Sequence, residues 1–157
     1  MEPSRRIFAV VPAYNEAQAI GAVVAGLRGI VAEVIVVDDG SRDATAEQAR
    51  LAGAKTVRHA INRGQGAAIA TGLRLAVQEG ADVIVTFDAD GQHQAEDIPR
   101  LVAPVLAGEA DVALGSRFLA AGSNVPPLRR LVLKLAVAFT ALTTVRLSFR
   151  ALFNQHD

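Results

Sequence analysis

The sequence predicts an α/β domain in which helices flank a mainly parallel sheet. Short apolar runs alternate along the chain with longer amphipathic or Ala-rich stretches, which is the pattern of repeated β-α units. The composition agrees, because 51% of the residues are hydrophobic but only 4% are aromatic, so that Ala, Val, Leu and Ile supply the apolar bulk. With 157 residues, the chain has the length of one ordinary domain.

The first β-α unit is expected at the start of the chain. Residues 7–11 form an apolar run, and we expect Pro12 to end that strand because proline has no backbone N–H to donate. The helix is expected at residues 17–27, with Gly29 near its end. The second strand is then expected at residues 34–37.

The next two units follow the same pattern. Asp43 and Thr45 are suitable caps for a helix that runs to about Leu51, because their side chains can accept from free backbone N–H groups. A short third strand is expected at residues 55–58. Residues 67–77 are expected to continue the chain as a helix.

The last two strands are expected at residues 83–87 and 112–114, with a helix at residues 96–106 between them. The earlier of these strands contains only Val, Ile, Thr and Phe, which all favour a buried pleated surface, and Asp88 ends it. The fifth strand is expected to close at Gly115-Ser116-Arg117.

Basic residues gather in the C-terminal part of the chain. Residues 1–116 hold 10 basic and 15 acidic side chains, whereas residues 117–157 hold 6 and 1. We expect a basic amphipathic helical segment at residues 126–150, apolar almost all round between Leu128 and Thr144. Its charges argue against a membrane-spanning helix, which needs about 20 largely uncharged residues. Two interpretations stay open: a helix at an anionic membrane surface, and a helix packed on the sheet or on a partner.

The cellular compartment is constrained by what the sequence lacks. There is no cysteine, which excludes a disulfide framework and a thiolate metal site but leaves the redox compartment undetermined by thiols. The apolar stretch after Arg5 and Arg6 ends at Pro12, so it is too short for the hydrophobic region of a signal peptide. We therefore expect a cytosolic location.

Polar residues follow four of the expected strands. In open parallel sheets, ligands bind beyond the carboxyl ends of the strands. The four strand ends are Pro12-Ala13-Tyr14-Asn15-Glu16, Asp38-Asp39-Gly40-Ser41, Asp88-Ala89-Asp90-Gly91-Gln92-His93 and Gly115-Ser116-Arg117. Since all four would line one edge of the sheet, we expect the functional site there.

The acid-x-acid turn formed by Asp88 and Asp90 is the sharpest of these motifs. Two carboxylates that share one space repel each other unless a cation lies between them or one of them is protonated. Mg²⁺ or Mn²⁺ prefers oxygen ligands and commonly bridges carboxylates to substrate phosphates. Gln92 can add an amide oxygen. The alternative interpretation is an ordinary surface turn, which Gly91 would equally allow.

The other strand ends carry side chains that suit a nucleotide. A carboxylate at Asp38 or Asp39 can accept from a ribose hydroxyl or a base N–H, and Tyr14 offers a ring for packing on the base. Arg117 is placed to meet a phosphate. Structural interpretations stay open for each: Tyr14 as a half-buried tyrosine, Glu16 as a first-turn acid that stabilises the helix dipole, and Arg117 as a solvated charge.

The segment Asn62-Arg63-Gly64-Gln65-Gly66-Ala67-Ala68 precedes a helix, and such a turn can present backbone N–H groups to an anion. It lacks the third glycine of a dinucleotide-binding fingerprint at the required spacing. Alternatively, its glycines only let the helix pack closely on the sheet. His59 and His93 are candidate site residues, although no spacing marks either as a metal ligand.

Five motifs in this order resemble the family 2 glycosyltransferases, in particular the dolichyl-phosphate or polyprenyl-phosphate sugar synthases. The resemblance covers roughly residues 6–135. The motifs are Val10-Val11-Pro12-Ala13-Tyr14-Asn15-Glu16, Val36-Val37-Asp38-Asp39-Gly40-Ser41, Asn62-Arg63-Gly64-Gln65-Gly66, Asp88-Ala89-Asp90-Gly91-Gln92 and Gly115-Ser116-Arg117.

The resemblance implies a GT-A fold with a Rossmann-like sheet, and an inverting sugar transfer from a donor such as GDP-mannose or UDP-glucose. It also implies a polyprenyl phosphate acceptor, peripheral membrane contact at the cytosolic face and no nucleic-acid partner. Residues 1–125 would form the nucleotide-sugar-binding core of a single domain over residues 1–157. By matching position, the resemblance assigns binding of the nucleoside to Pro12, Tyr14, Glu16, Val37 and Asp39. It assigns the metal and the diphosphate to Asp88, Ala89 and Asp90, the metal also to Gln92, and the phosphates to Arg117. The catalytic groups would be Asp88, Asp90 and Arg117.

One departure from this resemblance lies near the C-terminus. Proteins of this type usually continue into a segment with a Thr-Asp and a Gly-Phe-Arg-like element, of which Phe149-Arg150-Ala151-Leu152 keeps a part. We therefore expect the chain to be short at its C-terminus, so that donor binding can persist without turnover. Beside an active glycosyltransferase, two alternatives stay open: a catalytically incomplete nucleotide-sugar-binding or regulatory domain, and a nucleotidyltransferase.

Overall fold

A computed structural model describes residues 5–92 and 94–115 of the chain. The chain divides into two compact units, Met1–Gly115 and Ser116–Asp157, and the described residues lie in the first of them. The predictions for His93, for Arg117 and for the helical segment at 126–150 therefore fall outside the described residues. The boundary expected at residue 125 stays a prediction.

The described part of the chain forms a four-stranded, fully parallel sheet with the order β3-β2-β1-β4. The strands are β1 (Ile7–Ala13), β2 (Glu33–Asp38), β3 (Lys55–Arg58) and β4 (Val83–Thr86). The helices are α1 (Ile20–Arg28), α2 (Thr45–Leu51), α3 (Gln65–Gln78) and α4 (Ile98–Leu106), with a short 3₁₀ helix η1 (Ala95–Asp97) before α4. The predicted α/β class with a parallel, helix-flanked sheet is confirmed.

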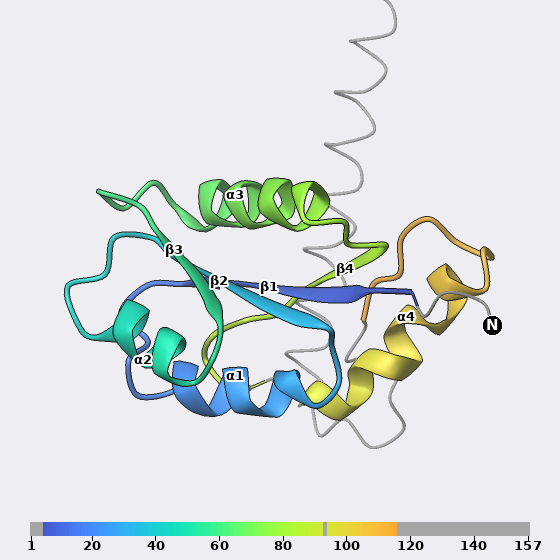
Figure 1. Ribbon diagram of the computed structural model, residues 1–157, viewed down its shortest axis with the longest axis horizontal. Helices are drawn as coiled ribbons and strands as arrows, with labels where there is room; N and C mark the ends of the chain where they lie inside the picture. The colour runs from blue at the N-terminus through green and yellow to red at the C-terminus, as the bar shows by residue number, and fades with distance from the viewer. Residues whose placement is uncertain (1–4, 93, 116–157) are drawn as a thin grey trace, which may run out of the picture. The chain divides into compact units, whose positions relative to one another are not determined.

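Helices cover both faces of the sheet, with α3 on one face and α1, α2 and α4 on the other (Figure 1). The buried β1 residues alternate between these faces. Ala9, Val11 and Ala13 join the core cluster that includes buried residues of α1 and α4, whereas Phe8 and Val10 join the cluster on the α3 side. Because both faces of the sheet are covered, the central strands β1 and β2 are apolar at almost every position, as the sequence predicts.

Small residues let α3 lie close to the sheet. Ala68, Gly72 and Ala76 are spaced four residues apart, so they share one face of the helix, and all three are buried. A Cβ atom added to Gly72 would lie 2.3 Å from Cγ1 of Val10, which is far inside contact distance. The glycine at this position therefore sets the separation between α3 and β1.

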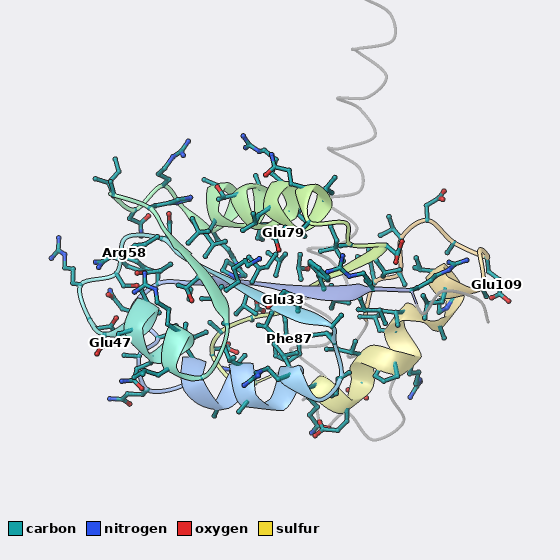
Figure 2. All side chains as sticks on the ribbon, in the orientation of Figure 1. Glu33, Glu47, Arg58, Glu79, Phe87 and Glu109 are labelled. Carbon is teal, nitrogen blue, oxygen red and sulfur yellow. The ribbon has the colours of Figure 1, made fainter. Side chains whose placement is uncertain are left out.

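Most charged side chains lie at the periphery of the layers, and most large apolar side chains lie in the core. Glu47 and Glu109 are exposed and lie at the periphery, whereas Phe87 is buried in the core between the sheet and a helix layer (Figure 2). Within the described ranges, no helix is both long enough and apolar enough to cross a membrane.

The prediction that Pro12 ends the first strand is wrong, because β1 continues to Ala13 and Pro12 pairs with Val37. The carbonyl of Val10 accepts from Phe87 N on the β4 side, and alternate residues of a strand point to the same side. The missing N–H of Pro12 would therefore face β4, whose pairing with β1 has already ended at Val10. Proline costs no ladder hydrogen bond at such a position.

The expected strand at residues 112–114 is also absent from the described structure. Val112 and Leu114 have exposed fractions of 72% and 87%, and neither belongs to a strand. An apolar run becomes a strand only where a neighbouring strand takes up its backbone hydrogen bonds and another layer covers its side chains. The described residues provide neither for this segment.

Candidate nucleotide-binding site

A pocket of about 410 Å³ lies at the carboxyl ends of β1 and β4. The chain leaves β1 toward β2 on one side, while β4 lies on the other, so this is the point where the strand order reverses. Parallel sheets bind their ligands at such a position. The lining residues are Pro12, Ala13, Tyr14, Glu16, Asp39, Asn62, Gln65, Ala68, Asp88, Ala89 and Asp90.

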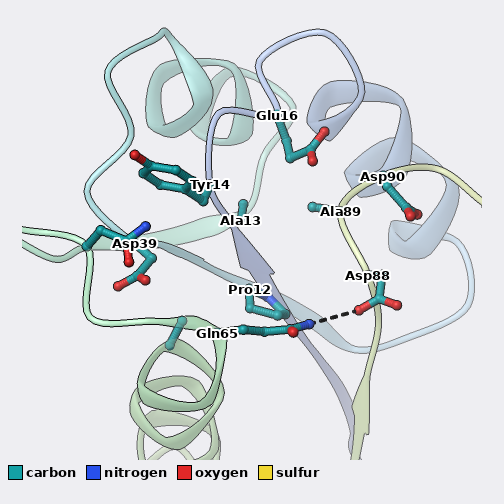
Figure 3. Close-up of a pocket in the computed structure, with 11 residues that line it drawn as sticks. Pro12, Ala13, Tyr14, Glu16, Asp39, Gln65, Asp88, Ala89 and Asp90 are labelled. Atoms are coloured by element: carbon teal, nitrogen blue, oxygen red, sulfur yellow. Dashed lines mark hydrogen bonds between the residues drawn. The ribbon is translucent and has the colours of Figure 1, made fainter.

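The labelled side chains divide the pocket into two sides (Figure 3). Tyr14 and Asp39 lie on one side, Asp88 and Asp90 lie on the other, and Pro12 and Ala13 are between them. Ala13, Ala68 and Ala89 have no side chain larger than a methyl group, which leaves room between the two sides. The pocket can therefore take an elongated ligand with one end at Asp39 and the other at the acid-x-acid turn.

The lining is strongly acidic. It includes four carboxylates, those of Glu16, Asp39, Asp88 and Asp90, and no Lys or Arg of the described residues. A phosphate group would be repelled by these side chains unless a cation or a basic group from elsewhere compensated them. The charge of the pocket thus favours a ligand that arrives with a cation.

The turn after β4 holds Asp88 and Asp90 in the lining. Oδ1 of Asp90 accepts from the backbone N–H of Gln92 at 2.9 Å, which fixes the turn locally. Nε2 of Gln65 lies 3.4 Å from Oδ1 of Asp88, at the long end of the hydrogen-bond range. Ala89 between the two aspartates is buried and belongs to the core, so it anchors the turn to the sheet.

These residues suit Mg²⁺ or Mn²⁺ in the chemistry of their donor atoms. Within the described ranges, no three His, Cys, Asp or Glu side chains cluster as a complete metal site. Magnesium is usually held by one or two carboxylates together with substrate phosphates and water, rather than by a cage of protein ligands. An incomplete set of two carboxylates with nearby amides fits that arrangement.

The loop after β1 is pinned to the loop after β2. The backbone N–H of Asn15 donates to Oγ of Ser41 at 2.8 Å, and that of Glu16 donates to Oγ1 of Thr45 at 2.8 Å. In return, Oδ1 of Asn15 accepts from the backbone N–H of Arg42. Asn15 has a φ of 57°, a conformation that asparagine tolerates better than most residues. These bonds fix the neighbours Tyr14 and Glu16 at the pocket.

The helix α1 begins later than predicted. It was expected from residue 17 but starts at Ile20, after a turn in which the carbonyl of Glu16 accepts from the backbone N–H groups of Ala19 and Ile20. Asp43 and Thr45 were predicted as caps of the next helix, but the N-cap of α2 is Ala44, without a side-chain hydrogen bond, and Thr45 is the first residue of that helix. Oδ1 of Asp43 still accepts from the backbone N–H of Thr45 at 3.0 Å.

Asp39 is a carboxylate of the pocket that several hydrogen bonds hold in place. Its side chain accepts from the backbone N–H groups of Arg63 and Gly64, at 3.0 and 2.7 Å, and Oδ1 lies 2.7 Å from Nδ1 of His59. The anion that the turn at 62–64 holds in this structure is thus Asp39 itself. Burial raises the pKa of Asp39, but the hydrogen bonds from Arg63, His59 and Gly64 outweigh it and hold the pKa below its usual range.

The lowered pKa of Asp39 predicts a pH-dependent contribution to stability. The charged carboxylate stabilises the fold fully above the unfolded-state value of 3.8, and this contribution is lost as the pH falls through the lower folded-state value. Asp39→Asn is expected to lower the free energy of unfolding by about 1–3 kcal/mol near neutral pH, because an amide cannot accept from every donor that faces it.

Urea unfolding of the wild type and Asp39→Asn at a series of pH values, from about 7 down to about 3, checks this expectation. The difference between them should shrink at the acid end. Asp111→Asn, at an exposed aspartate outside the pocket lining, is the matched control and should follow the wild type. A difference that stays constant over the whole pH range would contradict the lowered pKa.

Gly40 allows the close approach of the two loops around Asp39. It has a φ of 75°, and a Cβ atom at this position would lie 2.7 Å from the carbonyl carbon of Ile61. Both the backbone conformation and the lack of space require glycine here. The turn at 62–64 can therefore reach the carboxylate of Asp39 only because residue 40 has no side chain.

Most of the residues that the sequence predicts for the site lie together in the structure. Pro12, Tyr14, Glu16, Asp39, Asp88, Ala89 and Asp90 all line the pocket. The side chain of Val37 does not, because it is fully buried in the core on the α3 side. Gln92 is exposed and contacts Asp90 only through its backbone N–H.

Asn62, Gln65 and Ala68 also line the pocket. The sequence indicated the segment that contains them, but not these residues individually. Their signal was the Gly-rich turn before a helix, which indicated a close approach without saying which side chains face the ligand. The pairing of His59 with Asp39 had no sequence signal, since the two residues lie 20 positions apart.

Comparison with known proteins identifies related chains. The family model described as "Glycosyl transferase family 2" matches residues 8–152. An undecaprenyl-phosphate mannosyltransferase of Micrococcus luteus is 37% identical over 136 residues, which are 81% of this chain and 55% of that protein. A UDP-N-acetylglucosamine–dolichyl-phosphate N-acetylglucosaminyltransferase of Methanococcus voltae is 36% identical over 71% of this chain and 51% of that protein.

Solved structures share the fold. A Mycobacterium tuberculosis glucosyl-3-phosphoglycerate synthase, crystallised with Mn²⁺ and uridine-diphosphate-glucose, is 31% identical with a TM-score of 0.57, covering 68% of this chain and 41% of that one. The chain spans about half the length of the curated relatives that it matches.

Proposed function

This chain belongs to glycosyl transferase family 2, and we propose on that premise that it transfers a sugar from a nucleotide-diphosphate donor bound in the pocket between β1 and β4. The observation that carries this proposal is the acidic pocket at the point where the strand order of the sheet reverses, with Asp88 and Asp90 at one end of the pocket. A relative of the same fold was crystallised with Mn²⁺ and a nucleotide sugar, which supports a donor of this class.

In the proposed complex, the nucleoside lies at Tyr14 and Asp39, with Pro12 and Glu16 beside it. The diphosphate lies at Asp88, Ala89 and Asp90. Asp88 and Asp90 would hold Mg²⁺ or Mn²⁺ together with the diphosphate oxygens, with Gln92 as an additional amide ligand. Bound there, the cation supplies electrostatic stabilisation of the charge that develops on the leaving diphosphate.

The remaining chemistry is assigned to the chain's own groups. Tyr14 and Asp39 orient the nucleoside, so that the bond between sugar and phosphate is held at a fixed place in the pocket. Arg117, which lies outside the described residues, is proposed to meet the phosphates and to share in stabilising their charge. Inversion requires that the acceptor oxygen attack the sugar from the face opposite the leaving group.

For the acceptor, we propose a polyprenyl phosphate. Two relatives are named for transfer to undecaprenyl or dolichyl phosphate. The oxygen of a lipid phosphate is already anionic, so its attack needs no strong general base. The basic segment at residues 126–150 is proposed to face the cytosolic membrane surface, where such an acceptor resides.

The donor is proposed to be of the GDP-mannose or UDP-glucose type, and calorimetry tests its binding. We expect a nucleotide sugar of this type to bind the wild type in the presence of Mn²⁺ and to bind much more weakly in EDTA, because the four lining carboxylates repel an uncompensated diphosphate. Thermal-shift screening of nucleotide sugars with Mn²⁺ ranks the candidates, since a ligand of the native state raises apparent stability.

The results of these binding and turnover experiments distinguish the candidate functions from one another. Equal affinity with and without Mn²⁺ would contradict the proposed metal-dependent site. Binding without product formation, with polyprenyl phosphates supplied in vesicles, would identify a nucleotide-sugar-binding domain instead of an enzyme. Consumption of a nucleoside triphosphate would identify a nucleotidyltransferase.

A further inference from the structure

His59 lies behind the pocket, in contact with Asp39 but not in the lining. It follows β3 directly, and its backbone N–H donates to the carbonyl of Asp38 at 2.9 Å. Its exposed fraction is 9%. The ring joins two elements, because Nδ1 lies 2.7 Å from Oδ1 of Asp39 and Nε2 lies 3.0 Å from Oγ1 of Thr71 in α3.

The partners of the ring determine what it can do. The ionised carboxylate of Asp39 can only accept hydrogen bonds, so Nδ1 of His59 carries a proton and donates it. Nε2 is engaged by the hydroxyl of Thr71. With both nitrogens occupied, the ring has no atom left for a ligand or for proton transfer, which leaves it a positioning role.

The orientation of Asp39 depends on this contact. Oδ2 accepts from the backbone N–H of Gly64, and both oxygens share the N–H of Arg63. Among the residues that the structure describes, His59 is the one side chain that donates to Oδ1. The two backbone donors belong to one exposed loop. His59, by contrast, is held by the sheet through its backbone and by α3 through Thr71.

We propose that His59 is a positioning residue for nucleotide-sugar binding, which fixes the carboxylate of Asp39 in the plane that meets the nucleoside. This inference rests on the proposed function, in which Asp39 contacts the nucleoside. Without the bond from His59, only the two backbone donors of the exposed loop, Arg63 and Gly64, hold the carboxylate, so its orientation is less well fixed. The loss falls on donor affinity rather than on the chemical step, since His59 touches no reacting group.

Two substitutions separate the two ring nitrogens. The amide nitrogen of asparagine lies as many bonds from Cα as Nδ1 of histidine, so His59→Asn keeps a donor toward Asp39. The amide nitrogen of glutamine corresponds instead to Nε2, so His59→Gln keeps the contact with Thr71 and loses the bond to Asp39. The two variants are matched in polarity and differ in which bond they preserve.

Donor affinity by calorimetry with Mn²⁺, and KM and kcat where turnover is measured, test the proposal. His59→Gln is expected to raise Kd and KM for the donor by about tenfold or more, with kcat changed by less than about threefold, since a hydrogen bond to a charged group is lost. His59→Asn is expected to stay within about threefold of the wild type in all three quantities.

Thermal unfolding of both variants distinguishes positioning from a structural role. Equal donor affinity of His59→Gln and the wild type would overturn the inference, and so would equal losses of affinity in both variants that follow their losses in Tm. Failure of the wild type to bind any nucleotide sugar would refute the proposed function and this inference with it. Binding by the wild type together with unchanged binding by His59→Gln would refute this inference alone.

Discussion

Asp90→Asn is expected to lower donor affinity in Mn²⁺, and kcat/KM for sugar transfer, by at least about 10²-fold, the usual effect of removing one preorganised electrostatic contact. This substitution tests the negative charge of the side chain separately from its hydrogen bond. Asparagine keeps an oxygen that can accept from the backbone N–H of Gln92, the bond that holds the turn, but it no longer offers a carboxylate to a cation. Calorimetry and initial-rate measurements at several Mn²⁺ concentrations check the expectation.

Asp111→Asn removes the same charge at an exposed position that does not line the pocket, so it should behave like the wild type. Thermal unfolding should show no loss of stability in Asp90→Asn that could account for the effect. If Asp90→Asn bound the donor as tightly as the wild type and kept the same Mn²⁺ dependence, the assignment of the acid-x-acid turn to the metal would be wrong.

Gly72→Val is expected to lower the free energy of unfolding by about 3 kcal/mol or more, because the core has no space for the new side chain. The first added atom would already lie 2.3 Å from Cγ1 of Val10 and 3.2 Å from Cγ2 of Val37. Both valines are fully buried and β-branched, so neither can turn aside. The helix α3 must move away from the sheet, and urea unfolding measures the cost.

Gly21→Val, in α1, is the matched control. A Cβ atom at Gly21 meets nothing within 4 Å, and valine is no worse a helix former than glycine, so the free energy of unfolding should change by less than about 0.5 kcal/mol. Equal stability of Gly72→Val and Gly21→Val would contradict the close packing of α3 on β1.

Local patterns were enough to find the regular elements. The strands expected at 34–37, 55–58 and 83–87 lie within a residue or two of the observed β2, β3 and β4. The rule that a strand buried on both faces is apolar applies to β2, but not to β3, whose ends Lys55 and Arg58 are exposed. The same rule led to the wrong strand at 112–114, since an apolar run does not reveal whether a partner strand lies beside it.

Boundaries next to the pocket were predicted less well. The strand β1 runs past Pro12 because β4 no longer pairs at that level, and α1 starts at Ile20 rather than at residue 17. For β1, a neighbour that is distant in the sequence decides where the strand ends. Local propensity contains no information about that neighbour.

By itself, the sequence determined the α/β class, the edge of the sheet where the pocket lies and the carboxylates that line it, because these follow from hydrophobic periodicity and from the common direction of parallel strands. Only the tertiary structure decided how Asp39 is held. Its donors come from positions 20, 24 and 25 residues further along the chain, and they meet it because Gly40 lets the two loops touch. A hydrogen bond of this kind depends on the distance between loops in space, which the spacing of residues along the chain does not set.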